Sequence, residues 1–279
     1  MPLLEGKVAI VSGAGRGLGR AHALTLASHG AAVLVNDLGG EVRGGGRDGT
    51  VAEAVAREIV AAGGEAQADG GDVSTVAGAA GVVDRAGSLF GGVDVVVNNA
   101  GVSRLATVEE LDDEVLDLHL GVHLKGTVGL TRAAFPLMRE RGGGSVVNTV
   151  SGAGLFPEHP GTAAYASAKA AVYAFTKVAA IEGAAHGIRV NAVSPLAVTR
   201  MSEGFFARAQ PGAAELLGPE RVSVVVAFLA SPLARNITGR VLRVEGGHVC
   251  EVFTDRTAGA EAEWTPETLA ARMGEVLRG

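Results

Sequence analysis

The sequence is poor in cysteine, with Cys250 as the one thiol among 279 residues. A single cysteine excludes an internal disulfide and any site that needs several thiolate ligands. Because no His, Cys and Asp cluster has ligand spacing either, we expect no metal. The first residues also lack a basic stretch followed by a long apolar one, which a secretory signal requires. Together these features predict a cytoplasmic protein in a reducing environment.

Long uncharged apolar runs are also missing, and none approaches the roughly 18 residues that a membrane-spanning helix needs. Charge of one sign is not concentrated anywhere, since 24 Lys and Arg oppose 30 Asp and Glu for a formal net charge of −6. A chain without basic runs is unsuited to nucleic acid as its main partner. We therefore expect a small-molecule substrate, no nucleic acid and no membrane insertion.

Apolar residues and glycine, in contrast, are plentiful. Apolar residues make up 47% of the chain and charged ones 19%, which excludes intrinsic disorder, and the 42 glycines indicate tight turns and close backbone approaches. The length suits one large domain better than two. We predict a single domain over residues 1–248 and a C-terminal extension over 249–279.

Short β-branched runs alternate with longer alanine-rich segments of helical spacing, which predicts parallel strands joined by crossover helices. The expected strands are Lys7–Ser12, Ala32–Asn36, Glu65–Ala68, Val93–Asn98, Ser145–Val150, Ile188–Val193 and Val241–Val244. The expected helices are Gly17–His29, Thr50–Ala62, Val76–Phe90, Glu114–Arg141, Ala164–His186 and Pro219–Ala230. The fold class is thus α/β, a doubly wound parallel sheet of about seven strands with helices on both faces and ligand at the carboxyl ends of the strands.

Two segments depart from this rhythm. Leu38–Gly49 holds six glycines between a strand and a helix, and it is longer than the usual connection of about 2–6 residues. It is either a functional flap or flexible surface filler. Met201–Gly218 follows the sixth strand, where it forms either a lid over the substrate or an irregular pair of helices.

A glycine-rich turn follows the first strand and opens the first helix. There a diphosphate can bind to backbone N–H groups and the positive end of the helix. The alternative is structural, in which the glycines only allow a tight connection between the strand and the helix. The candidate cofactor-binding residues of this turn are Gly13, Gly15, Arg16, Gly17, Leu18 and Gly19. Asp37 ends the second strand 18 residues later, close to the roughly 20 expected of the acid that binds the adenosine ribose. Its carboxylate repels a 2′-phosphate and favours NAD over NADP, although Arg16 offsets this in part, and a solvated loop acid is the alternative.

Further polar groups follow the third and fourth strands. Asn98-Asn99-Ala100-Gly101 places two amides at a strand end, where they tie neighbouring strands together or face the ribose. Asp72-Val73 sets a carboxylate near the adenine amine or at the start of a helix. We take Asp72, Val73, Asn99, Ala100 and Gly101 as cofactor-binding candidates.

Tyr165 and Lys169 are four residues apart in a helical segment, so their side chains share one face. A phenol with a pKa near 10 is a poor base at neutral pH, and an ammonium nearby favours the phenolate. Ser151 ends the fifth strand at the same sheet edge and can hydrogen-bond a substrate oxygen. The three residues form a candidate catalytic set.

In this order the motifs resemble the short-chain dehydrogenase/reductase family over roughly residues 5–248. The resemblance is carried by Gly13, Gly17, Gly19, Asn98-Asn99-Ala100-Gly101, Ser151, Tyr165, Lys169, Arg189-Val190-Asn191-Ala192 and Val244-Glu245-Gly246-Gly247. It implies a Rossmann fold, hydride transfer between a nicotinamide and a secondary alcohol or ketone, and a homodimer or homotetramer. By the same resemblance Tyr165 is the acid/base, Lys169 lowers its pKa and holds the nicotinamide ribose, and Ser151 orients the reacting oxygen.

A finer likeness connects the chain with the branch that includes the (3R)-hydroxyacyl-CoA dehydrogenase part of peroxisomal multifunctional enzyme type 2 and its bacterial relatives. It rests on Val35–Gly40, Val122–Thr127 and Thr199-Arg200-Met201. Where many family members have an asparagine that supports a water linked to the lysine, this chain has His123, which either takes over that role or simply packs. Pro195-Leu196 replaces the usual Pro-Gly, and Val198 and Thr199 are assigned to the carboxamide with Pro195 beside them.

An apolar cleft is expected from Leu155, Phe156 and Pro157 together with Met201, Phe205 and Phe206. Such a cleft fits a 3-hydroxyacyl-CoA or a sterol-like lipid, and the alternative is that the same residues simply belong to the core. The alternatives are a 3-oxoacyl-carrier-protein reductase, another small-alcohol dehydrogenase, a dinucleotide-sensing regulator without turnover, and a methyltransferase.

Overall fold

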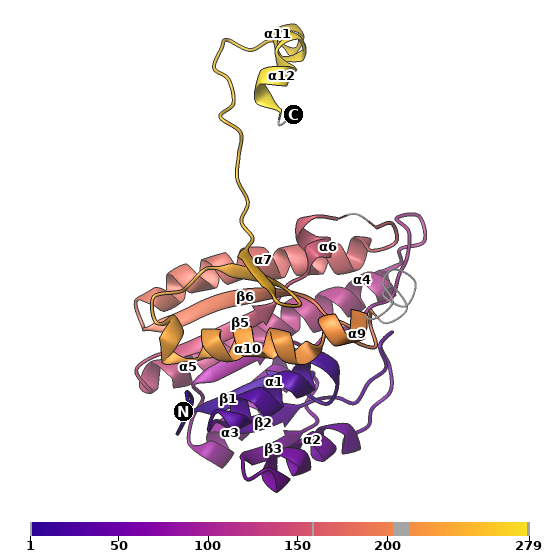
Figure 1. Ribbon diagram of the computed structural model, residues 1–279. Coiled ribbons are helices and arrows are strands. Elements are labelled where there is room, and N and C mark those ends of the chain that lie inside the picture. The colour runs from indigo at the N-terminus through magenta and orange to yellow at the C-terminus, as the bar shows by residue number, and fades with distance from the viewer. Residues whose placement is uncertain (1, 158, 203–212, 278–279) are drawn as a thin grey trace.

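The computed structural model describes residues 2–157, 159–202 and 213–277. Phe205 and Phe206, two of the expected cleft residues, lie outside the described ranges. Within these ranges the chain forms an α/β sandwich with one sheet between two helical layers, so the predicted fold class is confirmed (Figure 1). No helix of the described part is long and apolar enough to cross a membrane.

The sheet has eight strands in the order β3-β2-β1-β4-β5-β6-β7-β8. Their bounds are Val8–Ser12 for β1, Ala32–Asn36 for β2, Glu65–Asp69 for β3, Val95–Asn98 for β4, Gly144–Thr149 for β5, Ile188–Leu196 for β6, Val241–Glu245 for β7 and His248–Glu251 for β8. The first seven run parallel, whereas β8 pairs antiparallel with β7. All seven predicted strands are present, and their carboxyl ends meet at one edge of the sheet.

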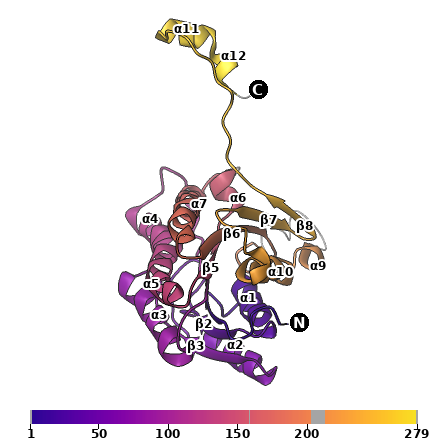
Figure 2. The ribbon, with the colours of Figure 1, turned by 90° about the vertical axis from the view of Figure 1, so that its left-hand side faces the viewer.

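Helices cover both faces of this sheet. Their bounds are Gly17–Ser28 for α1, Thr50–Ala61 for α2, Val76–Phe90 for α3, Asp113–His119 for α4, Gly126–Glu140 for α5, Gly152–Leu155 for α6, Ala163–Ala184 for α7, Ala213–Leu216 for α9 and Pro219–Ala230 for α10, with a 3-10 turn, η2, at Pro232–Ala234. Figure 2 shows α1, α2 and α10 on one side and α3, α5 and α7 on the other.

Alternate residues of the central strands enter opposite cores. In β1, Ala9 and Val11 pack in the core that includes α1, α2 and α10, whereas Ile10 packs in the core of α3, α5 and α7. All three side chains are completely buried. The near-continuous apolar character of the strands therefore follows from having helices on both faces.

One predicted helix, Glu114–Arg141, is divided in the structure. Between α4 and α5 lies a π-helical turn, η1, over Leu120–Lys125. Apolar spacing of 3.6 residues does not reveal one extra residue in a turn, so the sequence prediction missed it. Turns of this type are frequent at functional sites, and this one carries the buried His123.

The strand β8 was not predicted, and it begins at His248, the last residue of the expected domain, and continues into the expected extension of residues 249–279. After it the chain runs without regular structure to two short helices, α11 at Pro266–Ala271 and α12 at Met273–Val276, which stand well away from the body in both views (Figures 1 and 2). The first of them begins at Pro266, with Thr265 at its N-cap in a capping box. Among the described residues, the last hydrogen bond between this arm and the body joins Thr254 to Tyr173 at 3.2 Å.

Candidate active site

A cavity of about 1250 Å³ lies at the carboxyl ends of the parallel strands. Most of the predicted site residues line it, from the glycine-rich turn at one end to Ser151, Tyr165 and Lys169 at the other. The volume exceeds the roughly 300–1,000 Å³ of an ordinary ligand pocket, so there is room for two molecules side by side.

The glycine-rich turn forms one wall. Gly13 and Gly17 have φ of 62° and 52°, a left-handed backbone that other residues rarely adopt, and both line the cavity with Arg16 and Leu18. The other two glycines do not reach the cavity. A side chain on Gly15 would meet Val51, and one on Gly19 would collide with the carbonyl of Gly13, so both glycines serve close packing behind the turn.

Asp37 lines the cavity, but it also fastens the turn. Its two carboxylate oxygens accept hydrogen bonds of 2.7 Å from the N–H groups of Gly15 and Gly39. Asp37 is therefore not merely a solvated acid in a loop, because its carboxylate is held in place at the end of β2. Each oxygen keeps a lone pair that can accept from a ribose hydroxyl.

The two amides after β4 have separate tasks. Asn98 is buried and donates to Asn148 on β5 and Thr131 on α5, at 2.8 and 3.1 Å. Asn99 lines the cavity and donates to the carbonyls of Ser12 and Gly13. One amide therefore joins the strands beneath the site, and its neighbour holds the glycine-rich turn.

Asp72 and Val73 also line the cavity. The carboxylate of Asp72 accepts from the N–H of Ser74 at 2.9 Å, while the N-cap of α3 is Thr75. Asp72 thus shapes the turn before the helix rather than capping it.

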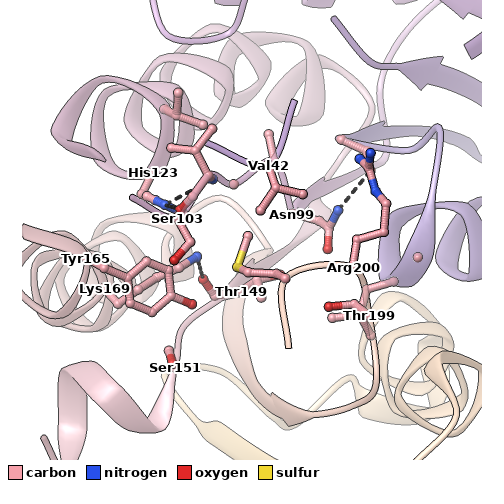
Figure 3. A pocket seen from close by; sticks show the side chains of 18 of the residues that line it. Val42, Asn99, Ser103, His123, Thr149, Ser151, Tyr165, Lys169, Thr199 and Arg200 are labelled. Atoms are coloured by element: carbon pink, nitrogen blue, oxygen red, sulfur yellow. Dashed lines mark hydrogen bonds between the residues drawn. The ribbon is translucent and has the colours of Figure 1, made fainter. Parts of the chain in front are cut away.

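The catalytic candidates meet at the other end (Figure 3). Tyr165 and Lys169 come from the first turns of α7, and Ser151 lies just beyond β5, where its hydroxyl also accepts from the N–H of Ala153. The ammonium of Lys169 is buried and donates to the carbonyl of Thr149 at 2.6 Å. Side chains from the end of β5 and from α7 therefore line one end of a single cavity.

Burial controls the titration of this group. It raises the pKa of Tyr165 above its usual range, and the hydrogen bond with Ser151 opposes this only in part. Burial also lowers the pKa of Lys169 to about 7. The Lys169 nitrogen is 5.9 Å from the centre of the Tyr165 ring, so the expected acidifying effect of the ammonium does not outweigh desolvation.

His123 is almost completely buried beside Tyr165, with the ring centres 5.2 Å apart and the planes at 86°. Its Nε2 lies 2.8 Å from the carbonyl of Val102 and 3.3 Å from the N–H of the same residue, and the shorter contact favours the tautomer with the proton on Nε2 and Nδ1 as an acceptor. Nδ1 is buried and has no hydrogen-bond partner among the described residues. Burial, followed by the charge of Lys169, holds the pKa of His123 well below its usual range, so the imidazole is neutral.

The glycine-rich segment Leu38–Gly49 forms a fixed wall of the cavity. The N–H of Ser103 donates to the carbonyl of Val42 at 2.8 Å, and Arg104 donates to the carbonyl of Arg43 at 3.2 Å. Leu38, Val42 and four neighbouring residues face the cavity (Figure 3). The filler alternative is therefore wrong for this part of the segment.

The loop after β6 closes the cavity from the opposite side. Pro195 and Thr199 line it with Met201, but Val198 does not, because it packs against Leu217 instead. Phe156 lines the cavity as expected. Sequence reasoning missed Arg243 on β7, whose position in the site depends on strand order and carries no motif.

A nicotinamide dinucleotide fits these residues. The left-handed glycines and the N-terminus of the twelve-residue α1 suit a diphosphate, and Asp37 suits a ribose. From there the cavity continues to Tyr165 and Lys169, where the nicotinamide would lie. No three His, Cys, Asp or Glu side chains within residues 2–157, 159–202 and 213–277 are placed to hold a metal ion.

Comparison with known proteins gives consistent matches. The family described as short chain dehydrogenase matches residues 7–208. The crystal structure of a short chain dehydrogenase from Mycobacterium avium superposes with a TM-score of 0.86 at 39% identity and covers 99% of this chain and 97% of that one.

Two relatives bear on the finer likeness. Hydroxyacyl-CoA dehydrogenase ChsB1 of Mycobacterium tuberculosis is 38% identical over 291 residues, covering 99% of this chain and 90% of the relative. Peroxisomal multifunctional enzyme type 2 of Mus musculus is 36% identical over 256 residues, which is 92% of this chain and 34% of that enzyme. The chain thus spans between 30% and 60% of the length of the peroxisomal multifunctional enzymes it matches, and the expected likeness to that branch is confirmed.

Proposed function

Since this chain belongs to the short-chain dehydrogenase family, we propose that it oxidises the secondary alcohol of a 3-hydroxyacyl thioester, or reduces the matching ketone, with NAD(H) as its preferred cofactor. Family membership makes it an oxidoreductase that acts on CH–OH groups with a nicotinamide cofactor. The substrate class and the preference for NAD are the new elements of the proposal.

The observation that carries the proposal is the convergence of Ser151, Tyr165 and Lys169 at the end of the cavity remote from the glycine-rich turn. A bound nicotinamide supplies or accepts the hydride. In the oxidative direction the Tyr165 phenolate takes the hydroxyl proton, and Ser151 holds the same oxygen by a hydrogen bond. Lys169 orients the cofactor ribose and supplies positive charge beside the phenolate.

The preference for NAD over NADP is proposed from the position of Asp37. Its carboxylate is held by two backbone N–H groups and cannot turn away from a 2′-phosphate, so NADP binding places two negative groups together. Arg16 lines the same end of the cavity and reduces this repulsion.

The substrate class is proposed from the relatives and from the cavity. ChsB1 is named a hydroxyacyl-CoA dehydrogenase, and the chain covers 90% of its length. Phe156 and Met201 add apolar surface beside the reacting end of the cavity. The proposed location is the cytoplasm, although the matched multifunctional enzymes are peroxisomal.

A substrate panel tests the proposal directly. The purified chain is given NAD or NADP with 3-hydroxybutyryl-CoA, a hydroxysteroid and a short secondary alcohol, and formation of the reduced cofactor is followed at 340 nm. We expect the highest kcat/KM with NAD and the acyl-CoA. Cofactor binding without turnover on any alcohol would instead favour the dinucleotide-sensing regulator.

A homodimer or homotetramer is also proposed, and the C-terminal arm supports it. Phe253 and Leu277 are 64% and 62% exposed, and Trp264 is 39% exposed. Helices of six and four residues are marginal in water without packing, since even isolated helices of about 12 residues barely form. A second copy of the chain is the partner expected to cover this surface.

Sedimentation of the full chain tests the assembly. The wild-type protein should sediment as two or four copies, and Leu277→Asp should weaken association without changing the helical content of the body. The exposed Val224, on α10, is a control position for Val224→Asp. A monomeric wild-type protein would rule out this assembly.

A further inference from the structure

Arg243 has no assigned role, yet its guanidinium lies at the substrate end of the cavity. It lines the cavity together with Ser151 and Gly152. A Cβ built on Gly152 would be only 3.2 Å from Nη1 of Arg243, so the guanidinium rests directly against this glycine. A cation therefore lies one residue along the chain from the hydroxyl proposed to hold the reacting oxygen.

Strand order explains how a residue so late in the chain reaches this place. On β6, Val193 pairs with Thr149 of β5, and the next residue, Ser194, pairs with Arg243 of β7. Arg243 is thus one register position beyond Thr149, level with the point where β5 ends and the chain turns to Ser151. The shared edge of parallel strands brings both residues to the cavity.

The guanidinium retains a donor that faces the site. Its Nη2 pairs with Glu245 at 3.2 Å, and Nε lies at 3.4 Å from the same carboxylate. The two side chains are 31% and 45% exposed, so this ion pair is weak. Nη1 has no hydrogen-bond partner in the described part of the chain, although arginine offers five N–H donors in a fixed plane.

We propose that Nη1 of Arg243 binds an anionic oxygen group of the substrate, a carboxylate or a phosphate, while its reacting oxygen is held by Ser151. The inference rests on the proposed function, because it takes the cavity end at Ser151 as the substrate end. A planar guanidinium suits both anions by geometry as well as charge. The remaining Glu245 contact keeps the guanidinium in place while Nη1 turns to the ligand.

Three probes with the same carbinol separate the possible sources of the anion. They are 3-hydroxybutyrate, which has a free carboxylate, 3-hydroxybutyryl-CoA, which has phosphates, and the N-acetylcysteamine thioester, which has neither. Arg243→Leu should raise KM about 10- to 100-fold for the acid or for the CoA ester, and change kcat and the neutral thioester less than threefold. The affected probe identifies the anion as carboxylate or phosphate.

Two further variants keep the result interpretable. Arg243→Lys should recover part of the lost affinity, because it restores the charge without the planar fork. Arg240→Leu is the matched control, since Arg240 precedes the same strand, pairs with Glu251 at 3.0 Å and does not line the cavity. An equal effect of Arg243→Leu on all three probes, or no effect on any, would overturn the inference.

Equilibrium binding makes the test independent of turnover. If the wild-type protein oxidises none of the probes, the proposed function fails, and titration calorimetry with the same three compounds still decides about Arg243. Loss of binding of an anionic probe in Arg243→Leu, with the neutral thioester unchanged, supports the site. Failure of both anionic probes to bind the wild-type protein refutes it.

Discussion

The two ends of the cavity differ in how their polar groups are used. At the cofactor end, the carboxylate of Asp37 and the amide of Asn99 already hold backbone groups of the glycine-rich turn. At the catalytic end, Nδ1 of His123 and the hydroxyl of Thr149 are buried and find no hydrogen-bond partner among the residues that the structure describes, and Lys169 is a buried amine. The polar side chains of the cofactor end thus form hydrogen bonds with the backbone around them, whereas those of the catalytic end can still form hydrogen bonds with a ligand.

This difference shows that the polar groups at the two ends contribute differently to the free energy of folding. Because the side chains of Asp37 and Asn99 already form hydrogen bonds with the backbone of the glycine-rich turn, the turn is stable without ligand. The geometry that binds the cofactor is therefore formed in advance. Buried polar groups without hydrogen-bond partners lower the stability of the fold. This cost is offset only when a ligand forms hydrogen bonds with these groups or when they take part in proton transfer. Substitutions at the catalytic end should therefore change rate, and those at the cofactor end should change binding.

The largest expected effect is that of Tyr165→Phe, at the catalytic end. It removes the acid/base hydroxyl and should lower kcat about 10³-fold while the affinity for NADH changes less than twofold. Steady-state kinetics and NADH fluorescence titration measure the two quantities. Wild-type turnover in this variant would refute the role given to the phenol.

Tyr173→Phe is the matched control for that experiment. Tyr173 and Lys177 have the same spacing on the same helix, and the Lys177 nitrogen lies 5.4 Å from the Tyr173 ring centre. Neither residue lines the cavity. Activity should therefore remain within twofold of the wild-type value.

The second prediction concerns His22, which joins the two ends of the fold by bonding Ser223 across α1 and α10 at 2.7 Å. Burial lowers its pKa to about 3 from the ordinary 6.5. Between these values the unfolded chain binds a proton that the folded chain does not, so stability falls as the pH falls from 6.5 to 3. The loss is on the order of 5 kcal/mol.

Chemical denaturation across that pH range measures the slope. His22→Gln keeps a hydrogen-bonding side chain but does not titrate, so its stability should depend less steeply on pH. His248→Gln, at an exposed position on β8, should leave the slope unchanged. Parallel slopes for the wild-type protein and His22→Gln would assign the acid sensitivity to other groups.

The third prediction addresses the cofactor end. Asp37→Asn removes the negative charge and should narrow the preference for NAD over NADP about tenfold, since like-charge repulsion disappears. Dissociation constants for both dinucleotides measure the ratio. Asp84→Asn is a suitable control, because this acid is exposed on α3 and does not line the cavity. An unchanged ratio in Asp37→Asn would show that another residue selects the cofactor.

The smallest expected effect belongs to His123, a positioning residue that packs edge-on against Tyr165. His123→Leu removes both the ring contact and the Nδ1 acceptor, so we expect a fall of about fivefold in kcat with little change in KM. His123→Asn retains an acceptor and should recover part of the rate. A change in KM alone, with an unaltered pH profile, would indicate ordinary core packing.

The fold was predictable because its signals are local. Buried strands such as Ala32–Asn36 are apolar up to their last residue, and helices such as Val76–Phe90 have regular spacing, so both ranges agree with the structure. The π turn at Leu120–Lys125 and the strand β8 were missed, since neither changes the periodicity of the sequence. Val198 was assigned to the carboxamide by comparison with the family's pattern after the sixth strand, but in the structure it packs against Leu217.

The amino-acid sequence by itself determined the doubly wound sheet, the glycine-rich turn and the chemistry of a phenol beside an amine. Spacing alone does not separate Tyr165 with Lys169 from Tyr173 with Lys177 along the same helix, and the first pair was chosen with the help of the family resemblance. The packing of α7 against the sheet supplies the physical reason, because it directs the first turns of the helix to the carboxyl ends of the strands. Arg243 reached Ser151 in the same way, through strand order, which depends on contacts between residues far apart in the chain.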